Sequence, residues 1–279
     1  MKVLITGGNR GIGKAAAEKL LNQNCEVIIT VRDPQKGRAA ISELKEKTGK
    51  SAINMVEGDL SDIQSCFTLA DRIKDQHQDI NCFISNAGVL MTEKQLNKDG
   101  LELNFMINYI APYILCRELV PVLKENEGTR IVNVNSALYT KGKLQLEKTP
   151  KGDDFHPIKS YASSKLCNVL FALDLAEELE GTGLTINSVH PGVINTGLGD
   201  SKTILSRIIK LIKPFWKKPD YGAIAPVWVA TSDELEGVSG KYFNEREEMA
   251  YIDYVKDEQL RQQLRNFTEE LIKEKTANV

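Results

Sequence analysis

The stretch from Lys2 to Gly13, KVLITGGNRGIG, decides the fold because it joins an apolar run to a glycine-rich turn. Val3 to Thr6 is apolar and partly β-branched, which predicts a buried strand. A helical pattern follows along Lys14 to Asn22, so the glycines stand where a strand passes into a helix. Glycines let the backbone turn sharply, and the free N–H groups and dipole of a helix N-terminus stabilise an anion. We therefore expect this turn to bind the pyrophosphate of a dinucleotide, with a glycine turn that holds no ligand as the alternative.

The same alternation of strand and helix continues along the chain. Five further short apolar runs are separated by stretches of helical periodicity: Val27 to Val31, Ala52 to Val56, Asn81 to Ser85, Arg130 to Val134 and Thr185 to Val189. Strands that alternate with helices form βαβ crossovers and therefore a parallel sheet. This predicts an α/β fold, a doubly wound Rossmann sheet of about seven parallel strands with helices on both faces. Ligands bind such sheets beyond the carboxyl ends of the strands, so the residues that follow each run are the candidates for a site.

The composition is that of an ordinary globular protein. The 279 residues carry 36 basic and 38 acidic side chains, and 42% of them are hydrophobic, which excludes a disordered or collagen-like chain. A net charge of −2 gives no general attraction to nucleic acid. We expect a single domain over residues 1–279, because α/β sheets commonly take this length as one unit.

The cysteines and the hydropathy point to a reducing, aqueous compartment. The five cysteines stand singly with no neighbouring histidine pair, so we expect neither a metal site nor a disulfide framework. No apolar run reaches the roughly 18 residues of a membrane span, and the first predicted strand begins at Lys2. These observations predict a cytoplasmic protein.

Two long segments break the alternation, 137–160 and 197–219, and loops of this length in a compact domain are usually functional lids. Within the second, 202–218 has the pattern of a basic amphipathic helix. Three interpretations stay open for it: a lid over an apolar substrate, a peripheral membrane contact, or a helix packed on the core. The apolar stretch 101–123 likewise fits either a homodimer contact or burial in the core.

The end of the second predicted strand distinguishes two nicotinamide cofactors. A carboxylate there binds the ribose hydroxyls of NAD, and an arginine binds the 2′-phosphate of NADP. Here Asp33 precedes Pro34, which is typical of a helix N-cap. That leaves Arg32, helped by Arg10, for the phosphate, so we predict that NADP(H) is preferred over NAD; two solvated arginines are the alternative. Asp59, after the third strand, is placed either to meet the adenine or to cap the next helix.

Tyr161 and Lys165 place a phenol and an amine four residues apart, on one face of a predicted helix. A cation roughly 4–5 Å from the phenol at an effective dielectric near 20 would favour the phenolate by about 3–4 kcal/mol. We therefore expect Lys165 to lower the pKa of Tyr161 by about 2–3 units, toward the range useful for proton transfer. Alone, this spacing occurs on many helices by chance.

The surrounding motifs resemble those of the short-chain dehydrogenase/reductase family. They are T-G-x-x-x-G-I-G at 6–13, N-A-G at 86–88, and the set Asn108, Ser136, Tyr161 and Lys165. The chain most resembles the retinol dehydrogenase-like branch, at residues 31–33, 161–168 and 236–243. Asn135 departs from the serine that many relatives carry before the catalytic serine; because Ser136 is retained, little is put in doubt.

The resemblance implies a role for each of these residues. Tyr161 would protonate a carbonyl or deprotonate an alcohol, Ser136 would hold the carbonyl oxygen, Lys165 would bind the nicotinamide ribose, and Asn108 would hold a water in a proton relay. Donors aimed in advance at a developing alkoxide are also what this chemistry needs. The residues expected to bind the cofactor are Gly7, Arg10, Gly11, Ile12, Gly13, Arg32, Asp59, Leu60, Asn86, Tyr161, Lys165 and Thr196.

These expectations describe an NADP(H)-dependent oxidoreductase of carbonyl reductase or alcohol dehydrogenase type. It would interconvert an apolar aldehyde or ketone and its alcohol by hydride transfer. Its partner would be a lipophilic small molecule and not a nucleic acid. The alternatives are a catalytically silent NADP(H)-binding sensor, or a membrane-associated binding protein on the same fold.

Overall fold

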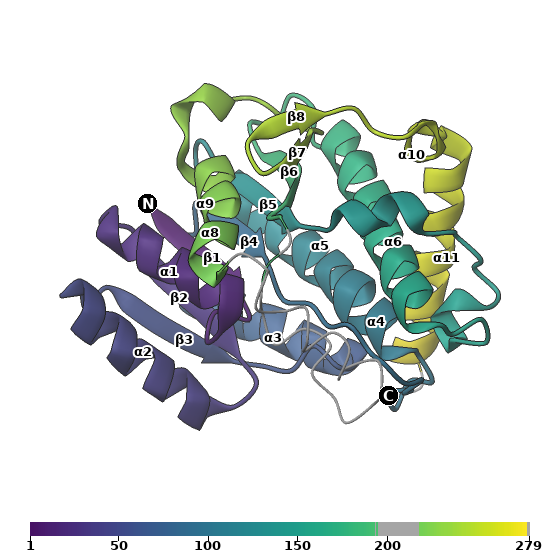
Figure 1. The fold of residues 1–279 in the computed structure, drawn as a ribbon, viewed down its shortest axis with the longest axis horizontal. Helices are drawn as coiled ribbons and strands as arrows, with labels where there is room; N and C mark the ends of the chain where they lie inside the picture. Colours follow the sequence, from purple (N-terminus) through teal and green to yellow (C-terminus); the bar gives the residue numbers. More distant parts are fainter. Residues whose placement is uncertain (193, 195–217, 278–279) are drawn as a thin grey trace.

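The computed structural model describes residues 1–192, 194 and 218–277 and is built on one central β-sheet (Figure 1). Within these ranges the sheet has eight strands in the order β3-β2-β1-β4-β5-β6-β7-β8. The strands are β1 (Lys2–Thr6), β2 (Glu26–Val31), β3 (Ile53–Glu57), β4 (Cys82–Ser85), β5 (Arg130–Val134), β6 (Thr185–His190), β7 (Tyr242–Asn244) and β8 (Glu247–Met249).

The predicted doubly wound α/β sheet is confirmed. The strands β2 and β3 lie on one side of β1, and the strands from β4 onward lie on its other side. The strands from β1 to β7 are parallel, whereas β8 pairs antiparallel with β7. The turn between β7 and β8 is tight, and Glu245 within it has a left-handed φ of 59°. A turn this short can only return the chain antiparallel, which explains the extra edge strand.

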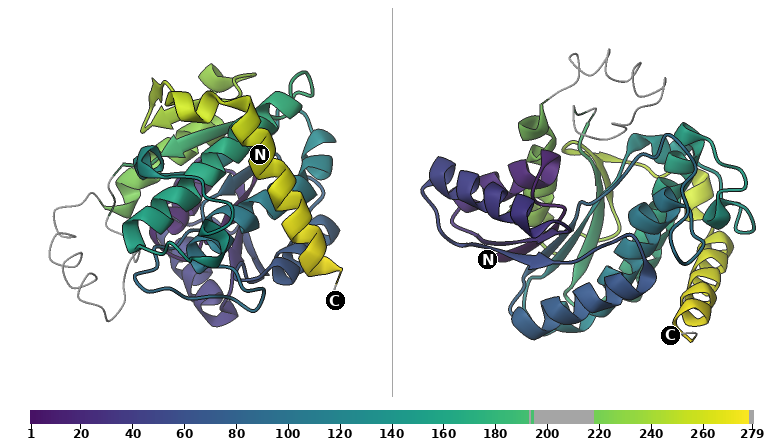
Figure 2. Two further views of the ribbon diagram at one scale, coloured as in Figure 1. Left: turned by 90° about the vertical axis from the view of Figure 1, so that its right-hand side faces the viewer. Right: turned by 90° about the horizontal axis from the view of Figure 1, so that it is seen from below.

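Helices cover both faces of the sheet, as the view from below shows (Figure 2). On one face, α1, α2 and α9 enclose an apolar cluster, and on the other α3, α5, α6 and α11 enclose a larger one. The helices are α1 (Gly11–Asn22), α2 (Pro34–Thr48), α3 (Ile63–Gln76), α4 (Leu103–Phe105), α5 (Ala111–Lys124), α6 (Pro157–Glu178), α8 (Pro219–Gly222), α9 (Ile224–Thr231), α10 (Asp253–Lys256) and α11 (Glu258–Thr276).

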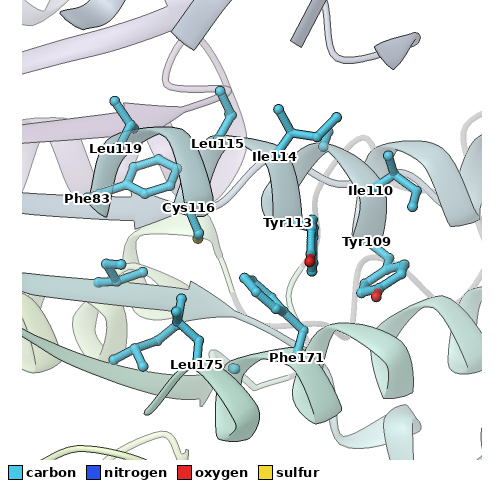
Figure 3. Packing of buried hydrophobic residues seen from close by; sticks show 14 of the residues in the cluster. Phe83, Tyr109, Ile110, Tyr113, Ile114, Leu115, Cys116, Leu119, Phe171 and Leu175 are labelled. Carbon is cyan, nitrogen blue, oxygen red and sulfur yellow. The ribbon is translucent and has the colours of Figure 1, made fainter. Parts of the chain in front are cut away.

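Residues 103–124 form one continuous apolar rod, in which a π-helical turn (Met106–Ile110) joins α4 to α5. The expectation that no apolar stretch reaches the length of a membrane span is wrong for this rod by length and composition, but 67% of its most apolar window is buried inside the protein. Figure 3 shows Tyr113 and Cys116 on the side of this rod that faces Phe171 and Leu175 of α6, and the rings of Tyr113 and Phe171 lie 4.8 Å apart. The rod is therefore a core helix.

The C-terminal helix α11 packs on the outer side of α6 and reaches α3 (Figure 2). Tyr109, in the π-helical turn, is hydrogen-bonded to Thr268 of α11 at 2.6 Å, and both side chains are fully buried. Tyr113 of α5 also reaches Glu269 at 3.3 Å. Core burial and α11 thus account for much of the apolar pattern of 101–123, and the homodimer contact stays a prediction.

The first predicted lid, 137–160, is held against the body of the protein. It forms two 3₁₀ turns (Ala137–Lys141 and Thr149–Lys151), and α6 already begins at Pro157, so the last four residues predicted as loop are helical. The cause is a capping site: the His156 side chain accepts a hydrogen bond from the Lys159 N–H, and proline takes the first helical position. Most of the second predicted lid, including 202–217, lies outside the described residues.

Candidate active site

Five of the predicted site residues follow the carboxyl ends of neighbouring strands and lie along the same end of the sheet. Along this edge the strands run in the order β3, β2, β1, β4 and β5. The residues that follow them are, in the same order, Asp59, Arg32, Gly7, Asn86 and Ser136. Residues from distant parts of the sequence thus line up on either side of the β1/β4 switch point, where ligands of such sheets bind.

The glycine turn between β1 and α1 has a backbone that only glycines fit well. Gly7 and Gly11 have left-handed φ angles of 67° and 55°. At Gly13 a Cβ atom would lie 2.5 Å from the Gly7 carbonyl oxygen and 2.6 Å from Asn86 Nδ2. These contacts exclude any side chain, so the first turn of α1 approaches the end of β1 closely.

The N-terminus of α1 fits the pyrophosphate of a dinucleotide. Its N-cap, Arg10, makes no side-chain hydrogen bond to the first N–H groups of the helix, and the first turn holds no acidic residue. These N–H groups and the helix dipole together form a site for an anion. The predicted residues Gly11, Ile12 and Gly13 supply them.

Asn86 holds the turn in place beside the first strand. Its side-chain amide donates to the Thr6 carbonyl at 2.9 Å, and its backbone N–H donates to the Thr6 hydroxyl at 2.9 Å. The N–H of Ala87 donates to the same hydroxyl at 3.0 Å. The N-A-G motif therefore ties the end of β4 to the glycine turn after β1.

The end of β2 has the arrangement that the sequence predicted. The Asp33 carboxylate accepts the N–H groups of Gln35 and Lys36 at 3.0 and 3.1 Å, which confirms its N-cap role at α2. These hydrogen bonds, first of all the one from Lys36, hold the pKa of Asp33 below its usual value. Arg32 is exposed at the tip of the strand, and Arg10 is exposed as well.

The interpretation of Asp59 as a helix cap is wrong. Asp62 caps α3, because its carboxylate accepts the Ser65 N–H at 2.8 Å. Asp59 instead accepts the Ser61 N–H at 3.0 Å in a local turn before the helix. Asp59 and Leu60 are both half-buried, and their predicted contact with the adenine stays a prediction. Thr196 lies outside the described residues.

Ser136 and Tyr161 meet across the junction of β5 and α6. Ser136 follows β5 and begins the 3₁₀ turn, with its hydroxyl accepting the Leu138 N–H at 3.3 Å. The Tyr161 side chain lies next to Ser136, and this neighbour lowers the pKa of the phenol. Both residues are less than a tenth exposed. A hydroxyl pair that faces the cofactor edge of the sheet is suited to bind and protonate one substrate oxygen.

Lys165 lies one turn further along α6 and is fully enclosed. Its ammonium group donates to the Val134 carbonyl at 3.0 Å, and only 4% of the residue is exposed. Burial lowers the pKa of Lys165 to about 8. The Val134 carbonyl could not have been found from the sequence, because every residue has one and only the fold selects which one is used.

The expected effect of Lys165 on Tyr161 is wrong for the protein without cofactor. Burial raises the pKa of Tyr161 to about 12, against the smaller lowering effect of the neighbouring Ser136. Desolvation disfavours the charged form of both groups, and it outweighs the attraction expected from the spacing in the sequence. At neutral pH Tyr161 is therefore a protonated phenol, which is the form that a proton donor needs.

Asn108 is fixed within the π-helical turn of the core rod. Its side chain exchanges two hydrogen bonds with the backbone of Val89, at 2.8 and 2.9 Å, and donates to the Ser164 hydroxyl at 3.0 Å. A Cβ atom on Gly88 would lie 3.2 Å from Asn108 Oδ1 and 3.6 Å from Lys165 Nζ. The absent side chain of Gly88 lets these two polar groups lie near each other.

Comparison with known proteins identifies relatives over most of the chain. The family model described as short chain dehydrogenase matches residues 1–204. Retinol dehydrogenase 12 from mouse is 33% identical over 97% of this chain and 85% of its own length. Retinol dehydrogenase 14 from human is 31% identical over the same shares of the two chains.

Solved structures share the fold. A Mycobacterium paratuberculosis protein has a TM-score of 0.77 and 26% identity, over 98% of this chain and 93% of its own. A short chain dehydrogenase from Escherichia coli, solved with NADPH, has a TM-score of 0.70 and 23% identity, over 88% of this chain and 96% of its own. Together with the glycine turn, the N-A-G tie and the enclosed Ser136, Tyr161 and Lys165, these likenesses show that the chain is an oxidoreductase of the short-chain dehydrogenase/reductase family, in its retinol dehydrogenase-like branch.

Proposed function

We propose that the protein is an NADP(H)-dependent oxidoreductase that interconverts an apolar aldehyde or ketone and the corresponding alcohol. The observation that carries this proposal is the placement of Ser136, at the end of β5, next to Tyr161 of α6, with the enclosed Lys165 one helical turn further along. The nicotinamide ring, when bound, supplies or accepts the hydride.

In the direction of reduction, this chain's residues bind the carbonyl oxygen and protonate it. Ser136 donates a hydrogen bond to that oxygen, and Tyr161 transfers its phenolic proton to it as alkoxide charge develops. The raised pKa of Tyr161, about 12, keeps this proton in place at neutral pH. Lys165, whose pKa is about 8, is mostly cationic there and stabilises the phenolate that remains.

Two arginines support the preference for NADP(H). The Asp33 carboxylate accepts N–H groups at the start of α2, so it is not free to oppose a 2′-phosphate at the end of β2. Arg32 is exposed at this strand end, and Arg10 stands at the N-terminus of α1. A guanidinium group binds phosphate with directed, charge-assisted hydrogen bonds.

The proposed substrate class rests on the relatives. Retinol is a long, apolar alcohol, and the similar proteins from mouse and human are named retinol dehydrogenases. An apolar alcohol or aldehyde is therefore the substrate class to examine first.

The test is a panel of retinoid, steroid, fatty and small aromatic carbonyls offered with NADPH that carries deuterium at nicotinamide C4. We expect at least one apolar carbonyl to be reduced, with the deuterium on its former carbonyl carbon, and NADPH to be used more efficiently than NADH. Tight NADPH binding without transfer to any carbonyl would reject the proposal and favour a binding or sensor role.

A further inference from the structure

Asn135, between β5 and Ser136, uses its backbone N–H and both ends of its side-chain amide in hydrogen bonds. Its backbone N–H donates to the Val189 carbonyl at 2.8 Å. Its side-chain oxygen accepts the Ser136 N–H at 2.7 Å, and its side-chain NH₂ donates to the Lys165 carbonyl at 3.2 Å. The residue is only 4% exposed.

The two side-chain bonds of Asn135 end on two candidate catalytic residues from different elements. One bond fixes the backbone of Ser136 at the start of the 3₁₀ turn, and the other fixes the backbone of Lys165 in the middle of α6. A carbonyl oxygen has two lone pairs, so the Lys165 carbonyl can accept this bond in addition to its helical one. A single amide thus bridges the strand side and the helix side of the site.

The bridge is one of a series of hydrogen bonds along the junction of β5 and α6. The side chains of Asn133 and Asn168 are joined at 2.8 Å, and the Val134 carbonyl binds the Lys165 ammonium group at 3.0 Å. Next comes Asn135, and then the Ser136 contact with Tyr161. Asn135 is therefore the last fixed contact before the hydroxyl pair itself.

We propose that Asn135 is a positioning residue, which sets the register of α6 against the end of β5 so that the Tyr161 and Ser136 hydroxyls converge on one substrate oxygen. This inference rests on the proposed function and deepens it. The sequence alone indicates no role for Asn135, because the hydroxyl that follows it is retained. A serine at this position would be too short to reach both Ser136 and the Lys165 carbonyl.

The expected effect falls on turnover more than on cofactor binding. Residues that hold reacting groups in place change rates strongly, since a displacement of about 1 Å can cost about 100-fold in rate. The glycine turn and Arg32 lie on other strand ends and share no bond with the Asn135 side chain. Loss of the bridge should therefore lower kcat and leave NADPH affinity nearly unchanged.

Asn187 on β6 offers a matched control. It is equally buried, at 3% exposure, and its side chain also joins two backbone groups: it donates to the Val238 carbonyl at 2.7 Å and accepts the Lys241 N–H at 2.9 Å. These bonds end on the loop before β7 and not on a catalytic residue. Asn187→Ala therefore removes the same chemistry from the core without touching the junction of β5 and α6.

The experiment compares the full-length wild type, Asn135→Ala, Asn135→Ser and Asn187→Ala with the best carbonyl of the panel. It measures kcat and KM at saturating NADPH, the Kd of NADPH by fluorescence, and the Tm of each variant. We expect Asn135→Ala to lower kcat by about tenfold or more, with the Kd of NADPH within about threefold of wild type. The kcat of Asn135→Ser should lie between those of the wild type and Asn135→Ala. Asn187→Ala should lower Tm but keep kcat within about twofold of wild type.

Several outcomes overturn the inference. A kcat for Asn135→Ala near that of wild type would do so, as would equal losses of kcat in Asn135→Ala and Asn187→Ala. If Asn135→Ala does not fold, Asn135→Ser decides, and an undiminished kcat there is equally contrary. A wild type that binds NADPH but turns over no carbonyl rejects the proposed function itself, and the inference with it.

Discussion

Gly13→Ala tests whether the turn before α1 binds the cofactor by close approach of backbone. The added Cβ would lie 2.5 Å from the Gly7 carbonyl oxygen, whereas ordinary contact begins at 3.4 Å. The Gly7 oxygen belongs to the backbone, and the Asn86 side chain is hydrogen-bonded to the Thr6 carbonyl, so neither group can move away freely. The N-terminus of α1 must therefore move outward, by about 1 Å, away from the end of β1.

The size of the effect follows from the cost of overpacking. Such insertions cost about 1–3 kcal/mol, which corresponds to a Kd for NADPH raised by about 5- to 150-fold if the strain is expressed in the bound state. Isothermal titration of wild type and variant measures this directly. Loss of folding stability is measured in parallel, as the shift of Tm.

Gly49→Ala is the control for a general effect of substituting a glycine. Gly49 follows α2 with a φ of 67°, and a Cβ there would meet no atom within 4 Å. The variant should lose about 1 kcal/mol of folding stability through backbone strain, with NADPH affinity unchanged. If Gly13→Ala binds NADPH within about twofold of wild type, the assignment of the turn to the pyrophosphate is refuted.

Other variants test the remaining features. Arg32→Ala should raise the Kd of NADPH at least about tenfold and change that of NADH little. The neighbouring Asp33→Ala should lower Tm through loss of the α2 cap without altering the preference for NADPH over NADH. Equal losses of affinity for both cofactors in Arg32→Ala would contradict the assignment of Arg32 to the 2′-phosphate. For Lys165, with a usual pKa of 10.5 lowered to about 8 by burial, the unfolded chain binds more protons between these values, so folding stability rises with pH in that window. Lys165→Met should remove up to about 3 kcal/mol of this rise in the free energy of unfolding, as measured by urea unfolding at pH 8 and 10.5. An unchanged pH dependence in the variant would show that the amine is not desolvated. Tyr109→Phe removes the buried bond to Thr268 and should cost about 1–2 kcal/mol in urea unfolding, whereas no change would mean that α11 contributes little to stability.

The positions of the site residues could be predicted because they follow from short-range patterns. The glycine turn, the Asp33 cap and the runs that became the first six strands depend on backbone freedom, hydrogen bonding to adjacent residues and burial of both sheet faces. Parallel strands then bring their carboxyl ends to one edge whatever loops join them. The order of Asp59, Arg32, Gly7, Asn86 and Ser136 along that edge follows from this topology.

The electrostatics of the site could not be predicted in the same way. The spacing of Tyr161 and Lys165 indicates proximity but says nothing of desolvation, which depends on how many neighbours α6 and β5 bring around each group. The Val134 carbonyl and the two-sided bridge of Asn135 depend on the register of α6 against β5. The antiparallel β8 depends on a single turn at Glu245, an unusual residue for a left-handed φ.

The measurement that tests the central claim most directly separates binding from chemistry in Tyr161→Phe. With NADPH and an apolar carbonyl that the wild type reduces, single-turnover kinetics give the rate of hydride transfer, and fluorescence gives the Kd of NADPH. We predict a rate lower by about 10²- to 10⁴-fold, with the Kd within about twofold of wild type. A variant that reduces the carbonyl at the wild-type rate would contradict the role of Tyr161 as proton donor.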